Sequence, residues 1–166
     1  MNDDVLTDPL TALAASVLSA ARANGDLIAT AESCTGGLVS ATLTSVPGAS
    51  DVFDRGFVTY TNTAKSELLD VPYWLIENHG AVSEEVARAM AGGALKRSNA
   101  SLAVAVTGIA GPGGGTADKP VGLVHFAAGR REGPMEHAQV QLGDIGRNDI
   151  RQRSVEHALI MLQSLM

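Results

Sequence analysis

The order of helical and strand-like segments is the feature that most limits the possible folds of this chain. Apolar residues recur at helical spacing from Leu10 to Ala21, and Asn24-Gly25 ends the pattern. A short apolar run predicts a buried strand at Leu27 to Ala31. The same criteria predict further helices at Leu38 to Leu43, Asn62 to about Asp70, Ser83 to about Arg97 and Asp149 to Leu165, with Asn62 and Ser83 as capping residues. Further strands are predicted at Gly56 to Thr61, Leu102 to Val106, Val121 to Ala128 and Glu136 to Leu142, with turns or loops at Val46 to Ser50 and Gly111 to Gly115.

Helices alternate with strands in the first half of this order, and three strands follow one another in the second half. That order predicts a mixed sheet covered by helices on both faces, which is a three-layer α/β/α architecture. A length of 166 residues, without an internal repeat or linker, suits a single domain over residues 1–166, with residues 1–8 as a flexible lead. Apolar residues make up 45% of the chain and aromatic residues only 4%, so the core must consist mainly of aliphatic side chains.

Composition argues against several functional classes. The formal net charge is −6 and no run of Lys or Arg is present, so we expect no nucleic-acid partner. Cys34 is the single cysteine, which excludes an intrachain disulfide. The acidic segment Met1 to Pro9 lacks the basic start of a secretory signal, and no apolar run reaches the roughly 18 residues of a membrane span. We therefore expect a cytoplasmic protein without a membrane partner.

The first place where chemistry can occur is the strand-to-helix junction Glu32 to Gly37. It carries Ser33, Cys34 and Thr35, followed by the glycine pair Gly36 and Gly37. A serine at such a junction lies near unpaired N–H groups that can stabilise an oxyanion, and the glycines permit close approach of a substrate. Ser and Thr are also common helix caps, and the G-x-S-x-G motif of hydrolases is missing. From the residues alone, both a cap and a nucleophile remain open.

The second place lies at the end of the next predicted strand, where Tyr60 is followed by Lys65 in the first turn of a helix. A cation there opposes the helix dipole, and this effect, together with desolvation, would lower the lysine pKa toward that of a usable base. The alternative is an ordinary surface lysine, which the spacing does not exclude.

The third place is the loop Thr107 to Gly115, which follows a predicted strand and has the composition of a loop that binds anions. It matches neither the dinucleotide-binding pattern nor the P-loop pattern. The four histidines are scattered without metal-ligand spacing, so we expect no metal site; they are His79, His125, His137 and His157. Cys34 could act as a nucleophile beside Ser33, or could simply be a small buried thiol.

Taken together, four segments resemble one known family. They are TAESCTGG (Thr30 to Gly37), DRGFVTYTNTAK (Asp54 to Lys65), GAVSEEVA (Gly80 to Ala87) and TGIAGPGGG with DKPVG (Thr107 to Gly122). They resemble the nicotinamide-nucleotide amidohydrolases, the family of the C-terminal domain of competence/damage-inducible protein A. The motifs occur in the order of the family and cover nearly the whole chain from residue 8 onward.

The resemblance implies an α/β fold and hydrolysis of nicotinamide mononucleotide (NMN) to nicotinate mononucleotide and ammonia, as part of pyridine nucleotide recycling. It implies Ser33 as nucleophile, Lys65 as base and Tyr60 as an assisting hydroxyl, with no cofactor. Thr107 matches a Ser or Thr near the substrate, and Arg147 matches a substrate-contacting arginine for which Arg151 is the alternative. The resemblance also implies a dimer or larger homo-oligomer and, without the N-terminal domain of longer relatives, a stand-alone deamidase.

These residues combine into an expected mechanism. Neutral Lys65 takes the proton of Ser33, which attacks the amide carbon, while backbone N–H groups from Cys34 to Gly37 hold the oxyanion. The loop Gly111 to Gly115, or an arginine, can bind the single phosphate of the substrate. Further expected substrate-binding residues are Thr35, Gly36, Gly37 and Gly108. Two other functions stay open: a catalytically weak domain that binds a small regulatory ligand, and an amidase for another small amide.

Overall fold

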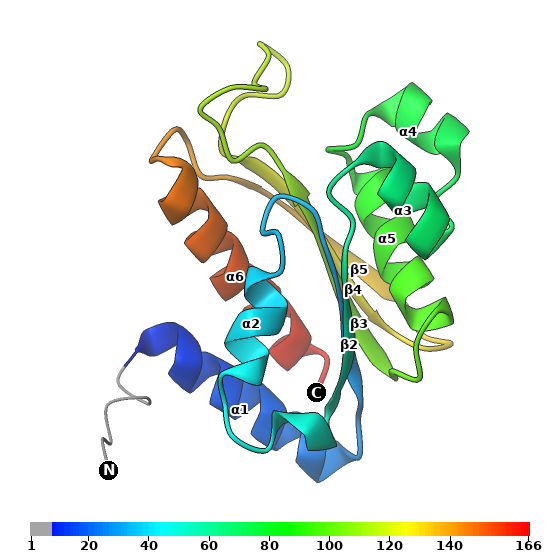
Figure 1. Ribbon diagram of the computed structural model, residues 1–166, viewed down its shortest axis with the longest axis vertical. Coiled ribbons are helices and arrows are strands. Elements are labelled where there is room, and N and C mark those ends of the chain that lie inside the picture. The colour runs from blue at the N-terminus through cyan, green and yellow to red at the C-terminus, as the bar shows by residue number, and fades with distance from the viewer. Residues whose placement is uncertain (1–7) are drawn as a thin grey trace.

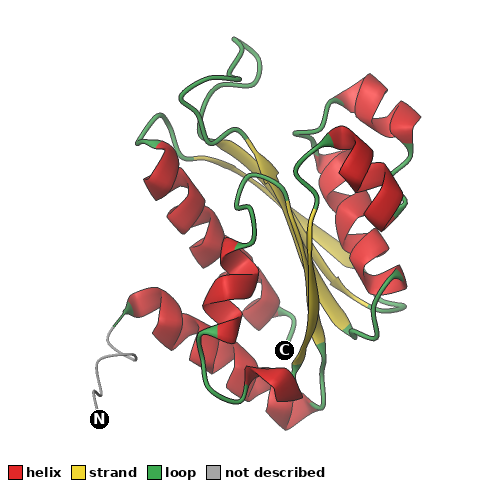
Figure 2. Cartoon of the chain, in the orientation of Figure 1, coloured by secondary structure: helices red, strands yellow, loops and turns green. Residues whose placement is uncertain are grey.

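A computed structural model describes residues 8–166 as one five-stranded sheet between two layers of helices (Figures 1 and 2). The helices are α1 (Pro9–Asn24), α2 (Leu38–Thr44), η2 (Ala49–Asp51), α3 (Asn62–Leu69), α4 (Tyr73–His79), α5 (Glu84–Lys96) and α6 (Arg147–Ser164). The strands are β1 (Ile28–Glu32), β2 (Phe53–Val58), β3 (Leu102–Gly108), β4 (Leu123–Arg130) and β5 (Met135–Gln141). The predicted three-layer α/β/α fold is confirmed. The predicted flexible lead falls almost entirely on residues 1–7, which lie outside the described residues.

The sheet has the order β2-β1-β3-β4-β5 and mixes two kinds of pairing. Strands β2, β1 and β3 are parallel to one another, whereas β3, β4 and β5 pair antiparallel. Parallel neighbours need a crossover connection, which explains why helices separate β1, β2 and β3 in the sequence. The carboxyl ends of β2, β1 and β3 therefore meet at one edge of the sheet, where ligands bind in open α/β folds.

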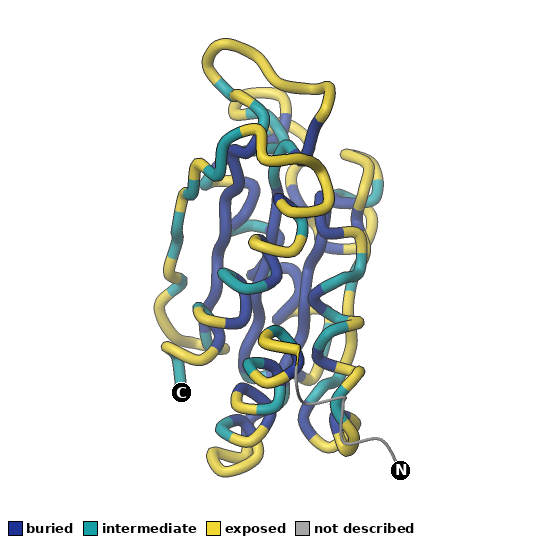
Figure 3. The backbone as a smooth tube through the Cα atoms, turned by 90° about the vertical axis from the view of Figure 1, so that its left-hand side faces the viewer, coloured by how far each residue is buried: buried dark blue, intermediate teal, exposed yellow. Residues whose placement is uncertain are grey.

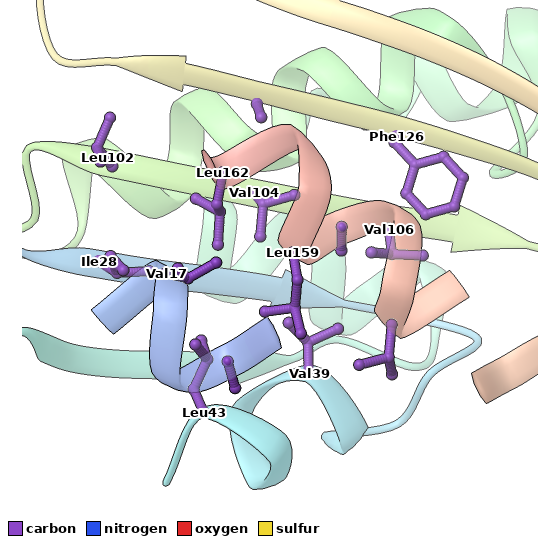
Figure 4. Close-up of a cluster of buried hydrophobic side chains, with 14 of the residues drawn as sticks. Val17, Ile28, Val39, Leu43, Leu102, Val104, Val106, Phe126, Leu159 and Leu162 are labelled. Atoms are coloured by element: carbon purple, nitrogen blue, oxygen red, sulfur yellow. The ribbon is translucent and has the colours of Figure 1, made fainter. Parts of the chain in front are cut away.

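The two faces of the sheet carry side chains of different size. Helices α1, α2 and α6 cover one face and pack on its larger residues, among them Ile28, Val104 and Phe126 (Figure 4). Helices α3, α4 and α5 cover the other face, on which β1 and β3 present alanines such as Ala29 and Ala103. The three central strands β1, β3 and β4 lie buried between these layers, whereas the edge strands β2 and β5 are partly exposed (Figure 3). Because side chains alternate along a strand, neighbouring residues of β1 point into different layers.

The structure differs from the local predictions in four respects. Strand β2 runs from Phe53 to Val58 and not from Gly56 to Thr61, because its partner β1 ends at Glu32, which pairs with Val58. Helix α4 had not been predicted at all, and η2 extends beyond the predicted turn at Val46 to Ser50. Thr61, and not Asn62, caps α3, since its hydroxyl accepts a hydrogen bond from the Ala64 N–H.

No helix among residues 8–166 is both long enough and apolar enough to cross a membrane.

Candidate active site

A cavity of about 260 Å³ lies at the edge where the parallel strands end. Its walls come from the turn after β1, the segment from Tyr60 into α3, the connection before α5, the glycine loop after β3 and the start of α6. This volume is close to the lower end of the roughly 300–1,000 Å³ that small-molecule sites occupy. A larger hollow of about 600 Å³ between the starts of α1 and α6 is lined by no cysteine, serine, threonine or lysine. The smaller cavity is therefore the candidate site.

Ser33 and Lys65 meet inside this cavity. The Lys65 Nζ lies 3.0 Å from the Ser33 Oγ and donates a second hydrogen bond, also of 3.0 Å, to the carbonyl oxygen of Thr59. Ser33 follows the last residue of β1, and α3 brings Lys65 over the sheet end from the neighbouring strand β2. A nucleophile and a base in hydrogen-bond contact form the unit that covalent catalysis needs.

Lys65 lies in an environment that disfavours its charged form. Its side chain is only 1% exposed, and it has no carboxylate ion-pair partner among residues 8–166. Burial lowers the pKa of the Lys65 amine below its usual value of 10.5. A neutral amine keeps two N–H donors and gains a lone pair that can accept the proton of Ser33. The alternative of an ordinary surface lysine is therefore wrong for Lys65.

Cys34 is the less suitable nucleophile of the two neighbours. Its side chain is 5% exposed, and burial raises the pKa of the Cys34 thiol to about 12. A thiol needs to ionise to act as a nucleophile, so this environment keeps Cys34 inert. Ser33, in contrast, has a base in contact with its hydroxyl.

The turn after β1 is held by the carboxylate of Glu32. Its Oε2 accepts hydrogen bonds from the N–H groups of Gly37 and Val39, both at 3.0 Å, and its Oε1 accepts from the Ser40 N–H and hydroxyl, both at 2.8 Å. These donors belong to the start of α2, whose N–H groups have no partner within the helix. Glu32 therefore does the capping that the sequence left open for Ser33 and its neighbours.

This capping narrows the choice of oxyanion donors. The Gly36 N–H donates to the Ser33 carbonyl at 3.0 Å, and the Gly37 N–H is taken by Glu32. Within residues 8–166, the N–H groups of Cys34 and Thr35 donate no hydrogen bond to another residue. Of these two residues only Cys34 lines the cavity, so the expected set from Cys34 to Gly37 reduces to the Cys34 N–H.

Tyr60 and Arg147 form a pair at the wall of the cavity. The Arg147 Nη2 donates to the Tyr60 hydroxyl at 2.8 Å, and its Nη1 donates to the Gly111 carbonyl at 2.7 Å. Both side chains are exposed, and both line the cavity. Arg147 thus presents a positive charge to anything bound there, whereas Tyr60 makes no hydrogen bond to Ser33 or Lys65 in the described part of the chain.

The other expected substrate-binding residues divide into two groups. Thr107 and Gly108, at the end of β3, line the cavity, and the Thr107 hydroxyl donates to the Ala81 carbonyl at 2.8 Å. Thr35, Gly36 and Gly37 do not line it, because the turn directs them toward α2 and α6. They support the turn instead of forming the cavity wall.

Arg151 lies behind the turn that bears Ser33 and not in the cavity. Its Nε and Nη2 donate to the carbonyl oxygens of Cys34 and Thr35, at 3.2 and 3.0 Å. Sequence reasoning did not foresee this contact, nor the roles of Glu32 and the Thr59 carbonyl. Only the acidic residue directly before Ser33 gave a signal, because carboxylates favour helix N-termini.

Within residues 8–166, no three His, Cys, Asp or Glu side chains converge in a way that could hold a metal ion. The nearest arrangement pairs His125 Nδ1 with His137 Nε2 at 3.0 Å, and a single carboxylate, Glu84, lies 3.5 Å from His137.

Comparison with known proteins finds similarity to CinA and competence-damage inducible proteins. Residues 10–166 match the family model described as the CinA C-terminal domain. A CinA-like protein of Parasynechococcus marenigrum is 49% identical over 152 residues, which cover 91% of this chain and 36% of that protein. The chain spans about a third of the length of the curated relatives it matches.

Solved structures of similar proteins share the fold of this chain over nearly its whole length. The competence/damage inducible protein CihA from Agrobacterium tumefaciens has 52% sequence identity and a TM-score of 0.92, with 93% of this chain and 94% of that chain covered. A CinA superfamily protein from Escherichia coli has 33% identity and a TM-score of 0.90, with 100% and 94% covered.

Proposed function

The chain belongs to the CinA C-terminal domain family, and from this premise we propose that it hydrolyses NMN to nicotinate mononucleotide and ammonia, with Ser33 as nucleophile and Lys65 as base. The observation that carries the proposal is the 3.0 Å contact between the Lys65 Nζ and the Ser33 Oγ, in a site that lowers the pKa of Lys65. The choice of NMN rests on the family resemblance. The choice of an amide hydrolysis rests on the chemistry of this pair.

Acylation begins with a proton transfer between the two side chains. The lone pair of Lys65 accepts the hydroxyl proton of Ser33, while one of its N–H groups stays on the Thr59 carbonyl. The Ser33 oxygen forms a bond to the carboxamide carbon, and the π electrons of the carbonyl move to its oxygen. Cys34 lines the cavity next to Ser33, and its N–H can donate to that oxyanion.

Collapse of this intermediate breaks the carbon–nitrogen bond. The proton held by Lys65 passes to the leaving nitrogen, so that ammonia departs and Lys65 is neutral again. A water molecule then gives a proton to Lys65 and attacks the acyl carbon. Breaking of the ester bond, with return of the proton to Ser33, releases the carboxylic acid and restores the enzyme.

The phosphate of NMN is favoured by a local positive charge, in a protein whose formal net charge is −6. Arg147 supplies one at the wall of the cavity, where Tyr60 and the Gly111 carbonyl hold its guanidinium. Arginine presents several N–H donors in a plane that matches the oxygens of a phosphate. The arrangement supports a small substrate with an anionic group near the reacting amide.

The experiment is ammonia release from NMN by four variants. S33A and K65A should lose activity, and K65R should lose it as severely as K65A because a guanidinium does not deprotonate. The expected loss for removal of a general base is about 10²–10⁴-fold in kcat. C34A should keep substantial turnover, because its thiol is buried and un-ionised.

Four outcomes would contradict the proposal. Near wild-type turnover of S33A would remove the nucleophile, and retained kcat in K65R would remove the base. Ammonia release from other small amides but not from NMN would replace the substrate, and binding of NMN without release would leave a ligand-binding domain.

A further inference from the structure

Arg151 holds the backbone of the turn that bears the nucleophile. It lies on α6, four residues after Arg147, and donates to the carbonyl oxygens of Cys34 and Thr35. A Cβ built on Gly36, whose φ is +59°, would lie 3.4 Å from the Arg151 Nη2. The glycine therefore gives the turn its left-handed residue, a backbone conformation that other residues rarely adopt.

Planar trans peptides carry this contact toward the active site. The Thr35 carbonyl, which Arg151 binds, shares a peptide plane with the Gly36 N–H, and these two groups point in opposite directions. That N–H donates to the Ser33 carbonyl. The Ser33 carbonyl in turn shares its plane with the Cys34 N–H, which donates to no other residue of the described chain. Two peptide groups thus connect the guanidinium with the N–H that follows the nucleophile.

We propose that Arg151 is a positioning residue that orients and polarises the Cys34 N–H as the oxyanion donor. The proposal rests on the proposed amide hydrolysis at Ser33. The connection through two peptide groups fixes the direction of the Cys34 N–H before substrate binds, which is the condition for effective oxyanion stabilisation. Hydrogen bonds in a chain also polarise one another, so the positive charge at the far end makes the Cys34 N–H a stronger donor.

The alternative role of Arg151, a direct contact to the substrate, has less support. Arg147 lines the cavity and Arg151 does not. The Nε and one Nη of Arg151 are already engaged by the two carbonyls. The two roles also differ in kinetics, since loss of a substrate contact raises KM, whereas loss of a donor made effective in the transition state lowers kcat.

The test compares R151Q and R151K with R153Q as the matched control. Arg153 lies on the same helix, is exposed and pairs with Glu156, so R153Q removes the same charge away from the turn. Ammonia release gives kcat and KM. The rate constant for covalent labelling of Ser33 by a fluorophosphonate gives a second measure that needs no amide substrate. An unfolded fraction lowers the amplitude of labelling and not this rate constant.

R151Q should lower both kcat and the labelling rate constant by about 10–100-fold, somewhat less than the 10²–10³-fold reported for complete removal of an oxyanion donor, with KM changed less than about threefold. R151K keeps a charge and one contact and should lie between R151Q and wild type, while R153Q should match wild type. If the loss of R151Q is confined to KM, or its labelling rate constant stays within about twofold of wild type, the positioning role is wrong. Wild type that is labelled at Ser33 but releases no ammonia would contradict the proposed function alone, and the labelling of R151Q would still decide the role of Arg151.

Discussion

Replacing Glu32 with Gln tests whether the carboxylate before Ser33 stabilises the turn and the start of α2. Glu32 is 1% exposed and its two oxygens accept four hydrogen bonds from three residues of that segment. Gln has nearly the same shape, but it has only one acceptor oxygen, and its NH₂ group cannot accept. The substitution therefore changes hydrogen bonding while the volume of the side chain stays nearly constant.

The size of the effect follows from the better of the two amide orientations. With the oxygen at the Oε2 position, the Gly37 and Val39 N–H groups keep their acceptor, and the Ser40 hydroxyl can turn to accept from the amide. The Ser40 N–H then faces an NH₂ group and stays unpaired, which costs about 1–3 kcal/mol. The two remaining bonds lose a charged acceptor, at roughly 0.5–1 kcal/mol each. The expected loss of unfolding free energy is about 2–5 kcal/mol, or about 4–20 °C in Tm for a chain of this size.

Urea unfolding followed by circular dichroism measures this loss, with E77Q as the control. Glu77 is exposed on α4, so its change should stay within about 0.5 kcal/mol. An E32Q protein as stable as E77Q would refute the inference that this carboxylate satisfies the start of α2.

Three further outcomes are expected. Because burial lowers the pKa of Lys65, the unfolded chain binds more protons than the folded chain at pH values between that lowered pKa and 10.5. The stability of wild type should therefore rise with pH over this window relative to that of K65M. Parallel curves of Tm against pH for the two proteins would contradict this prediction. G93A should destabilise the protein by about 1–3 kcal/mol in thermal unfolding, since its Cβ would lie 2.0 Å from the Leu69 carbonyl oxygen. The control G92A, whose Cβ would have nothing within 4 Å, should stabilise it by about 0.5–1 kcal/mol. Equal Tm values for the two variants would argue against close packing of α3 on α5. Dialysis against EDTA should leave ammonia release unchanged, because no expected step uses a metal ion; activity lost and then restored by zinc or magnesium would contradict this mechanism.

Prediction of the fold succeeded where apolar residues recur with a clear period and failed where they do not. Helix α1 shows apolar residues at helical spacing, and Gly25, which ends that pattern in the sequence, is its C-cap. Helix α4 has only seven residues, of which Ile76 is buried while Tyr73 and Trp74 are exposed. Its sequence therefore has no apolar stripe from which a helix could be predicted. Strand β2 was placed three residues too late because alternation continues beyond Val58, whereas pairing depends on the length of its neighbour β1. Pairing length is not a property of the strand's own sequence.

The sequence indicated part of the candidate site, but not its geometry. The sequence places Ser33 and Lys65 at the ends of adjacent elements, and the parallel pairing of β1 and β2 brings them into contact. The sequence could not distinguish Arg147 from Arg151, because residues four apart lie on the same face of a helix. Only the rise along α6 separates a guanidinium in the cavity from one behind the turn.

The alternation of side chains along β1 explains how one short segment supports both the fold and the site. Glu32 points into the layer of α2, where it binds the free N–H groups of that helix. Ser33, the next residue, points to the opposite side, where α3 supplies the Lys65 amine. The carboxylate and the amine are thereby kept on different sides of the sheet and form no ion pair in the described structure. A salt bridge between them would favour the protonated form of Lys65, so the period of two along the strand supports the proposed role of Lys65 as a base.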